Sequence, residues 1–146
     1  GRVMSGEKFN LAVVVDDDVV YLDTVALMLR AIGFKQIKTY ENGLDAIEAI
    51  ENDRPDLVIS DWDMPIMTGI DLLMCVRDDP DLVTVPFILN TGHLEQARRT
   101  EAIRCGVTEF LAKPFGFKDI KAIVLRAMDQ VDEADREEVF AAKRAS

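Results

Sequence analysis

Side chains that could carry phosphoryl-transfer chemistry follow four separate apolar runs of this 146-residue chain. Asp16 and Asp17 come directly after NLAVVV, and Asp61 follows LVIS in the stretch DLVISDWDMPIMTG. Thr91 stands near the end of PFILNTG, and Lys113 follows EFLA. A carboxylate nucleophile, further carboxylates for a metal, a hydroxyl and an ammonium group are together the parts for phosphoryl transfer. This chemistry requires a fold that brings the four runs side by side.

The three carboxylates predict a bound cation. Two carboxylates about 4 Å apart repel each other by roughly 4 kcal/mol at an effective dielectric constant of 20. Mg²⁺ suits such a cluster, because this ion is held by a few carboxylates together with water and phosphate oxygens. A lysine neutralises a phosphate as a point charge, and a threonine hydroxyl can donate to one of its oxygens. We therefore expect Mg²⁺ as the cofactor.

The elements that must position these residues alternate along the chain. The predicted strands are 10–15, 36–40, 57–59, 87–89 and 108–112, and the predicted helices are 19–32, 44–51, 70–78, 94–105 and 119–131. Five such βα units predict an α/β fold with a doubly wound five-stranded parallel sheet, in strand order 2-1-3-4-5. In this fold the carboxyl ends of the strands share one edge, so we expect the chemical residues to meet there.

Composition limits the partners and the location. The 27 acidic and 17 basic residues give a net charge of −10, which opposes direct binding to nucleic acid and to anionic membranes. No apolar run approaches the roughly 18 residues that span a bilayer, and the N-terminus lacks a signal-peptide layout. Cys75 and Cys105 lack metal-site spacing, and we expect both to be buried in a reducing compartment. A cytoplasmic protein is predicted.

The length predicts one folded domain. We assign residues 10–130 to this domain and residues 1–9 to a disordered leader or tag remnant. Residues 131–146 are rich in acidic side chains, and we expect a helical or disordered C-terminal extension there.

Residues 10–130 resemble the receiver domain of bacterial two-component response regulators, the CheY-like family with a flavodoxin-like (βα)5 fold. The resemblance rests on VVVDDD, DLVISDWDMPIMTG, NTG and FLAKPF, in this order and spacing. It implies that Asp61 is the phosphoacceptor. It also implies that Asp17 and Asp61 bind Mg²⁺ directly, that Asp16 helps to hold the ion through water, and that the main-chain carbonyl of Asp63 completes the protein ligands.

The same resemblance implies roles for the later motifs. Thr91 and Lys113 would bind the phosphoryl oxygens, and the Lys113-Pro114 peptide bond would be cis. Thr91 and Phe110 would be the switch pair: when Thr91 turns toward the phosphoryl group, the ring of Phe110 fills the vacated space. The surface of the fourth helix, fifth strand and fifth helix would change as a result.

Two positions that vary within the family, Asp63 and His93, are expected to tune the phosphoryl lifetime, together with Gly92 beside them. Our hypothesis is that Asp63 and His93 pair across the mouth of the site and control the access of water. Gly92 would leave the entrance sterically open beside them.

The function implied is a phosphorylation-controlled signalling switch, not an enzyme with an external substrate. The phosphoryl donor would be a sensor histidine kinase or a His-containing phosphotransfer protein. The output would be a downstream protein, or an output domain cut off from this segment, and a phosphorylation-dependent dimer stays open.

Two alternative functions remain open from the sequence. Asp61-Trp62-Asp63 resembles the D-x-D motif of haloacid-dehalogenase-like phosphatases, although that motif normally follows the first strand. The other is a receiver-like scaffold that works without phosphorylation.

Overall fold

The computed structural model of this chain describes residues 9–129. The predicted leader and extension therefore lie outside the described residues, except for Phe9. The ring of Phe9 packs edge-on against Phe34, with 5.2 Å between the ring centroids, and its carbonyl accepts a hydrogen bond from the Lys35 N–H at 3.0 Å. The prediction that the leader extends to Phe9 is wrong, because this ring is part of the folded domain.

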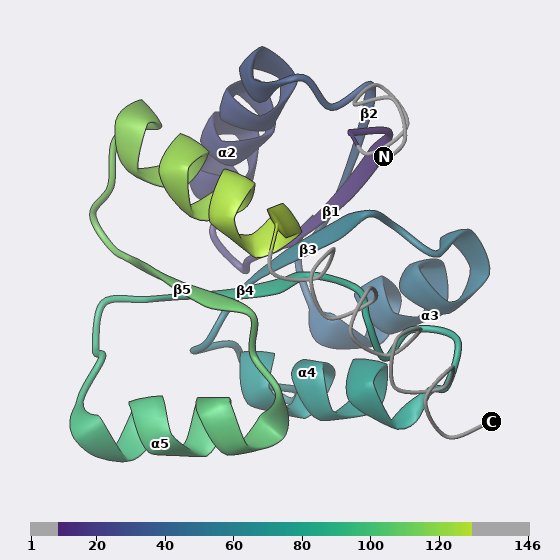
Figure 1. The fold of residues 1–146 in the computed structure, drawn as a ribbon, viewed down its shortest axis with the longest axis vertical. Coiled ribbons are helices and arrows are strands. Elements are labelled where there is room, and N and C mark those ends of the chain that lie inside the picture. Colours follow the sequence, from purple (N-terminus) through teal and green to yellow (C-terminus); the bar gives the residue numbers. More distant parts are fainter. Residues whose placement is uncertain (1–8, 130–146) are drawn as a thin grey trace, which may run out of the picture.

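Helices and strands alternate through the described part of the chain, as Figure 1 shows. The elements are β1 (Leu11–Val15), α2 (Val19–Ile32), β2 (Gln36–Tyr40), α3 (Gly43–Asp53), β3 (Leu57–Asp61), α4 (Gly69–Asp78), β4 (Phe87–Thr91), α5 (Gln96–Cys105), β5 (Glu109–Ala112) and a last helix over residues 117–129. The strands are all parallel, in the order β2-β1-β3-β4-β5. The predicted fold class and strand order are confirmed.

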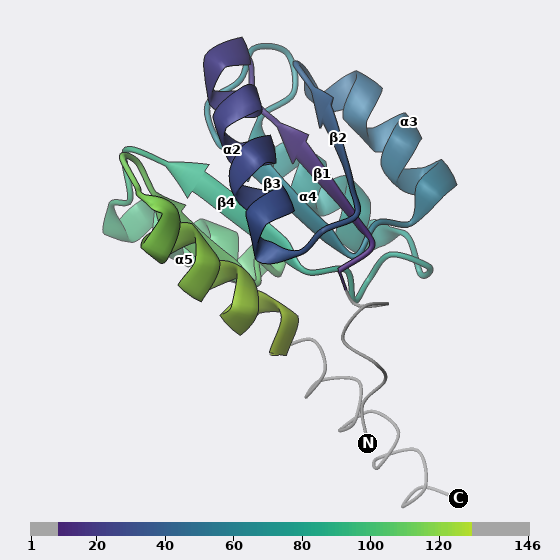
Figure 2. The ribbon, with the colours of Figure 1, turned by 90° about the horizontal axis from the view of Figure 1, so that it is seen from above.

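The sheet is covered by helices on both faces (Figures 1 and 2). Val13 and Val15 of β1 face the side of α3, α4 and α5, whereas Ala12 and Val14 face α2 and the last helix. Because successive strand residues point to opposite faces, β1 buries every side chain, which explains its continuous apolar run.

The central strands are longer than their apolar runs. β3 continues to Asp61, which pairs with Asn90, and β4 continues to Thr91, which pairs with Ala112. Polar residues at these strand ends carry no hydrophobic signal, so the sequence predicted the strands too short. Their inclusion in the sheet fixes the backbone on which the chemical side chains stand.

Side-chain caps start helices α2 and α4 beside the carboxyl edge of the sheet. The Asp18 carboxylate accepts hydrogen bonds from the Val20 and Tyr21 N–H groups at the start of α2. Thr68 and Asp71 form a reciprocal capping box at the start of α4. These caps turn the chain into each helix within a few residues of the strand ends.

Further predicted details differ from the structure. Helix α5 begins at Gln96, not at residue 94. The last helix begins at residue 117, not 119, since the Asp119 carboxylate accepts from the Gly116 N–H and stabilises an earlier first turn. Cys75 is exposed, because Leu72 and Val76 take the buried face of α4, so the expectation that both cysteines are buried is wrong. Among the helices described here, none is both long and apolar enough to cross a membrane.

Candidate functional site

Hydrogen bonds of the sheet continue into the loops that carry the site. The Trp62 N–H donates to the Asn90 carbonyl at 3.0 Å, and the Lys113 N–H donates to the Thr91 carbonyl at 2.9 Å. These hydrogen bonds hold the carboxyl ends of β3, β4 and β5 side by side at the same edge of the sheet. This is the edge where ligands bind in open α/β sheets.

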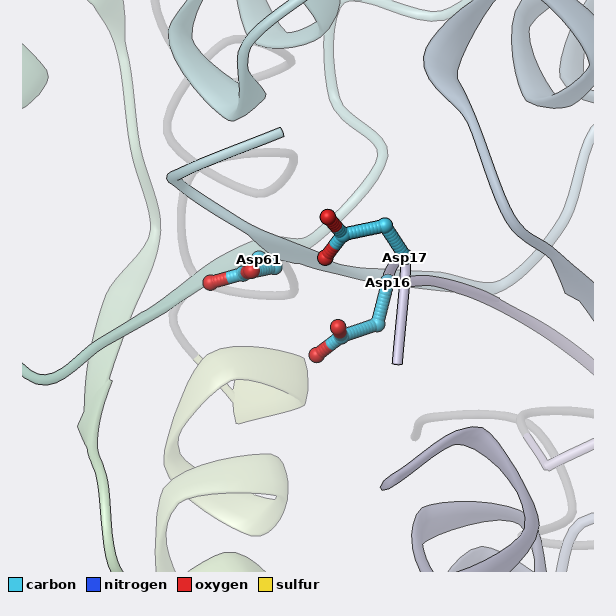
Figure 3. Close-up of side chains that lie close together, drawn as sticks. All are labelled: Asp16, Asp17 and Asp61. Carbon is cyan, nitrogen blue, oxygen red and sulfur yellow. The ribbon is translucent and has the colours of Figure 1, made fainter. Parts of the chain in front are cut away.

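Asp16, Asp17 and Asp61 form a carboxylate cluster at this edge (Figure 3). One oxygen of each residue lies within 4.8 Å of the others. Asp16 and Asp61 are buried, at 3% and 7% exposed, whereas Asp17 is exposed. The three side chains predicted from β1 and β3 are therefore brought together, with one open side.

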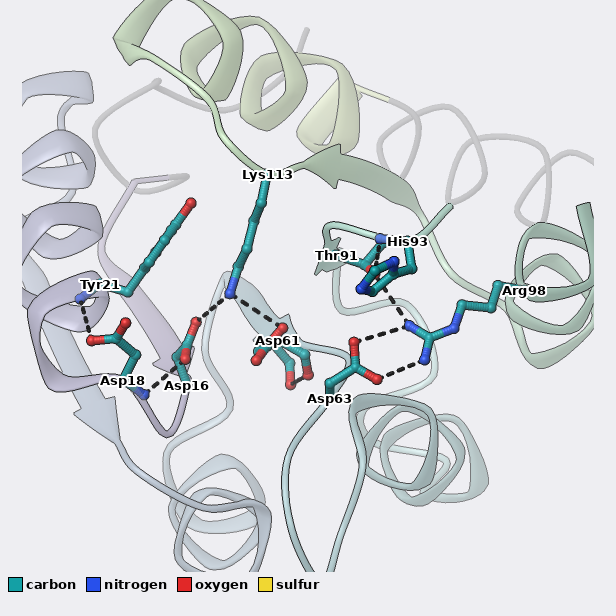
Figure 4. Close-up of polar contacts among 10 residues, drawn as sticks. Asp16, Asp18, Tyr21, Asp61, Asp63, Thr91, His93, Arg98 and Lys113 are labelled. Atoms are coloured by element: carbon teal, nitrogen blue, oxygen red, sulfur yellow. Dashed lines mark hydrogen bonds and ion pairs between the residues drawn. The ribbon is translucent and has the colours of Figure 1, made fainter. Parts of the chain in front are cut away.

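Lys113 lies between the two buried carboxylates (Figure 4). Its Nζ atom is 3.1 Å from Asp16 Oδ2 and 3.3 Å from Asp61 Oδ1. The same nitrogen lies 4.3 Å from the centroid of the Tyr21 ring, in a cation–π contact. The Lys113-Pro114 peptide bond is cis.

The site carries more buried negative charge than Lys113 offsets. Burial raises the pKa of Asp61 above its ordinary value, and the charge of Asp16 raises it further. Burial likewise raises the pKa of Asp16. Burial alone would lower the pKa of Lys113, but the nearby charges of Asp16 and Asp61 outweigh it and raise this pKa. An additional cation would relieve the cost of the ionised carboxylates.

The donor set fits Mg²⁺. It consists of oxygen atoms only, it includes an exposed carboxylate on Asp17, and three ligand oxygens converge within 4.8 Å. A hard divalent ion that keeps part of its water shell prefers this arrangement to a closed protein cage.

Thr91 is buried, and its hydroxyl oxygen is hydrogen-bonded to residues that follow β4 in the chain, as Figure 4 shows. The oxygen accepts a hydrogen bond from the His93 N–H at 3.0 Å and another from the Arg98 guanidinium at 3.2 Å. Thr91 therefore stands at the predicted strand end, with its oxygen held by the segment that follows it.

Asp63 has a different partner from the one expected. Its carboxylate is bound by both terminal nitrogens of Arg98, at 2.6 and 3.1 Å, and not paired with His93 as hypothesised. These hydrogen bonds lower the pKa of Asp63, and the charges of Arg98 and His93 add to the effect. The Arg98 guanidinium also lies over the Trp62 ring, 4.6 Å from its centroid.

Two residues of this site were missed in the sequence. Arg98 is the third residue of α5, and a cation in a first helical turn opposes the helix dipole, which signals a nearby acidic partner. Its partner Asp63 lies 35 residues away, so the pair itself could not be predicted. For Tyr21, no sequence signal distinguishes a ring against Lys113 from an ordinary helix residue.

The remaining predicted residues surround the site. Phe110 is half-buried on β5, with the Arg99 guanidinium 5.1 Å from its ring centroid. His93 is exposed. Gly92 is also exposed, and a Cβ added there would meet no atom within 4 Å, so the loop beside the site is sterically open.

Comparison with known proteins identifies the family. Residues 12–125 match the family model described as the response regulator receiver domain. The chain belongs to this family. It is similar to the chemotaxis protein CheY-3 of Vibrio cholerae, with 33% identity over 74% of this chain and 83% of that protein. It is also 30% identical to the chemotaxis protein CheY of Pseudomonas aeruginosa, over 82% of this chain and 96% of that protein.

Solved structures of receiver domains have the same fold. CheY4 of Vibrio cholerae aligns with a TM-score of 0.74 and 26% identity, over 84% of this chain and 98% of that chain. The receiver domain of the sensor histidine kinase PA1611 from Pseudomonas aeruginosa aligns with a TM-score of 0.74 and 25% identity, over 82% and 97%. That structure holds a magnesium ion in its active-site cleft. Membership of this family, with Asp61 on the third strand, leaves the phosphatase alternative without support.

Proposed function

We propose that this receiver domain is a phosphorylation-controlled switch, in which Asp61 accepts a phosphoryl group from a sensor histidine kinase or a His-containing phosphotransfer protein. The observation that carries the proposal is the position of Lys113 between Asp16 and Asp61, with Asp17 beside them. A buried nucleophilic carboxylate, an acidic metal site and a fixed ammonium are assembled at one strand end. This combination serves phosphoryl transfer.

In the proposed reaction, an Asp61 oxygen bonds to phosphorus while the bond from phosphorus to the donor imidazole nitrogen breaks. Asp16, Asp17, Asp61 and the Asp63 carbonyl would hold Mg²⁺, which when bound neutralises charge on the phosphoryl oxygens. Lys113 needs only a small displacement from Asp61 to pair with a phosphoryl oxygen. We propose that catalysis is limited to this self-phosphorylation and to hydrolysis of the acyl phosphate.

The output would follow from Thr91 and Phe110. When Thr91 binds a phosphoryl oxygen and Phe110 turns inward, the surface of α5, β5 and the last helix changes. α5 supports such a role because Ala102 is its one buried residue, so little apolar packing holds it. The partner would be a downstream protein or a separate output domain in the cytoplasm, and this surface could also mediate a phosphorylation-dependent dimer.

Acetyl phosphate tests the proposal. Intact-mass measurement should show one added phosphoryl group on the wild type with Mg²⁺, and little with EDTA. The Asp61→Asn variant should stay unmodified. Equal labelling of wild type and Asp61→Asn would refute the assignment of Asp61.

A further inference from the structure

Arg98 connects both sides of the site to helix α5 (Figure 4). From one guanidinium it donates to the Asp63 carboxylate in the loop after β3 and to the Thr91 hydroxyl at the end of β4. The planar fork of arginine suits such multiple contacts, and its stacking on Trp62 fixes the plane of the group. This ion pair is partly exposed, with 27% of the Arg98 side chain and 51% of the Asp63 side chain accessible. Such a pair adds little to the folding stability, so its main effect is to fix the position of the guanidinium.

The contact with Arg98 occupies the Thr91 hydroxyl in this conformation. The two acceptor positions of the Thr91 hydroxyl are filled by the His93 N–H and by Arg98. If this hydroxyl turned toward a phosphoryl group on Asp61, its hydrogen bonds from the His93 N–H and from Arg98 would be altered. The Arg98 contact is the one that joins Thr91 to a side chain of α5, so its loss separates the switch residue from the helix.

Helix α5 contributes little buried apolar surface to the core. It has one buried residue, Ala102, and its N-cap residue Glu95 makes no side-chain capping hydrogen bond. The neighbouring Arg99 covers the ring of Phe110, so consecutive arginines of the first turns reach both proposed switch residues. A contact made only in the resting state shifts the equilibrium toward that state by its own free energy.

We propose that Arg98 is a latch, a positioning residue that holds Thr91 and α5 in the resting conformation and must release Thr91 when Asp61 is phosphorylated. This inference rests on the proposed function and deepens it. The latch opposes occupation of the phosphoryl site. Removal of the Arg98 side chain should therefore tighten the binding of a phosphoryl mimic.

The test is a titration of the full chain with beryllofluoride, a phosphoryl mimic, in the presence of Mg²⁺. Trp62 is the single tryptophan of the sequence and reports binding by fluorescence. Arg98→Ala should tighten binding about fivefold, the usual net contribution of one hydrogen bond. Arg98→Lys should behave like Arg98→Ala, since an ammonium lacks the fork. Arg104→Ala removes the same charge from an exposed position of α5 and should bind like wild type.

A double-mutant cycle tests whether Arg98 affects binding of the mimic through Thr91. In a Thr91→Ala background, Arg98→Ala should no longer tighten binding. An equal gain in that background would overturn the latch, because the effect would not pass through Thr91. Unchanged binding by Arg98→Ala, or wild-type binding by Arg98→Lys, would overturn it too. Weaker binding by Arg98→Ala would make Arg98 a phosphoryl ligand instead. Wild-type protein that binds no mimic would refute the proposed function along with the latch.

Discussion

The ammonium nitrogen of Lys113 lies 3.3 Å from a carboxylate oxygen of Asp61, although Lys113 directly follows β5 and strand β4 separates β5 from β3 in the sheet. The lysine is thus already placed where a phosphoryl group on Asp61 would develop negative charge. Preorganised charge of this kind costs little reorganisation during the reaction. The unphosphorylated protein therefore holds a cluster of buried charges, and their effect on the free energy of unfolding can be measured.

Asp61→Asn should stabilise the folded protein at neutral pH in the absence of Mg²⁺. Burial and the charge of Asp16 raise the pKa of Asp61, so ionised Asp61 destabilises the native state above its folded pKa. This penalty disappears as the pH falls below the unfolded pKa of about 4. We expect the variant to melt about 3 °C higher per kcal/mol gained at pH 7, and the gain to shrink toward pH 4. Thermal unfolding in EDTA checks this, and a lower melting temperature at pH 7 would contradict it.

Asp17→Asn should abolish the stabilisation of the protein by Mg²⁺. Asp17 is exposed, whereas Asp16 and Asp61 are both paired with Lys113, so its removal takes a ligand without breaking a buried contact. Mg²⁺ at a hundredfold excess over its Kd should stabilise wild type by about 2.7 kcal/mol. Melting curves with increasing Mg²⁺ measure the effect, with Ca²⁺ as a comparison ion. A full Mg²⁺ response in Asp17→Asn would exclude this residue as a ligand.

Tyr21→Leu should slow phosphorylation by acetyl phosphate about two- to tenfold, the range expected for loss of a cation–π contact. The ring of Tyr21 lies 4.3 Å from Lys113 Nζ and packs against Phe115, so it restrains the ammonium near Asp61. Tyr21→Phe keeps the ring and should retain the wild-type rate. The rate of mass increase distinguishes the two. Equal loss in both variants would point to the hydroxyl group instead.

Asp63→Ala should speed autodephosphorylation by about twofold or more, since the pair with Arg98 would no longer restrict water at the mouth of the site. His93→Ala should have the smaller effect, because the Asp63 carboxylate is hydrogen-bonded to Arg98 and not to His93. Decay of the phosphorylated form after removal of acetyl phosphate measures both rates. If neither substitution changes the decay, the hypothesis that these residues tune the lifetime is wrong.

Much of the site followed from local patterns in the sequence. The run Leu57–Ile59 predicted a buried strand, and strict alternation with helices required a parallel sheet that brings Asp61 near the end of β1. Such reasoning works because strand ends in a parallel sheet share an edge whatever the side-chain details. Contacts between long side chains are different. Arg98 reaches Asp63, Thr91 and Trp62 only because α5 crosses the site at one particular rotation, and no local pattern encodes that rotation.

Gly69→Ala should destabilise the domain by about 1–3 kcal/mol and impair phosphorylation of Asp61. A Cβ at Gly69 would collide with the main-chain oxygen of Asp61 and lie 2.8 Å from Leu89 Cδ2 and 3.0 Å from Trp62 Cα. The Gly69 N–H also donates to the Trp62 carbonyl at 2.9 Å, so the first turn of α4 cannot withdraw without loosening the loop that carries Asp61. Gly92→Ala is the matched control for stability, because its Cβ would meet no neighbour within 4 Å. Chemical denaturation of both variants measures the difference, and equal stability would show that the backbone after Asp61 adapts to an added methyl group.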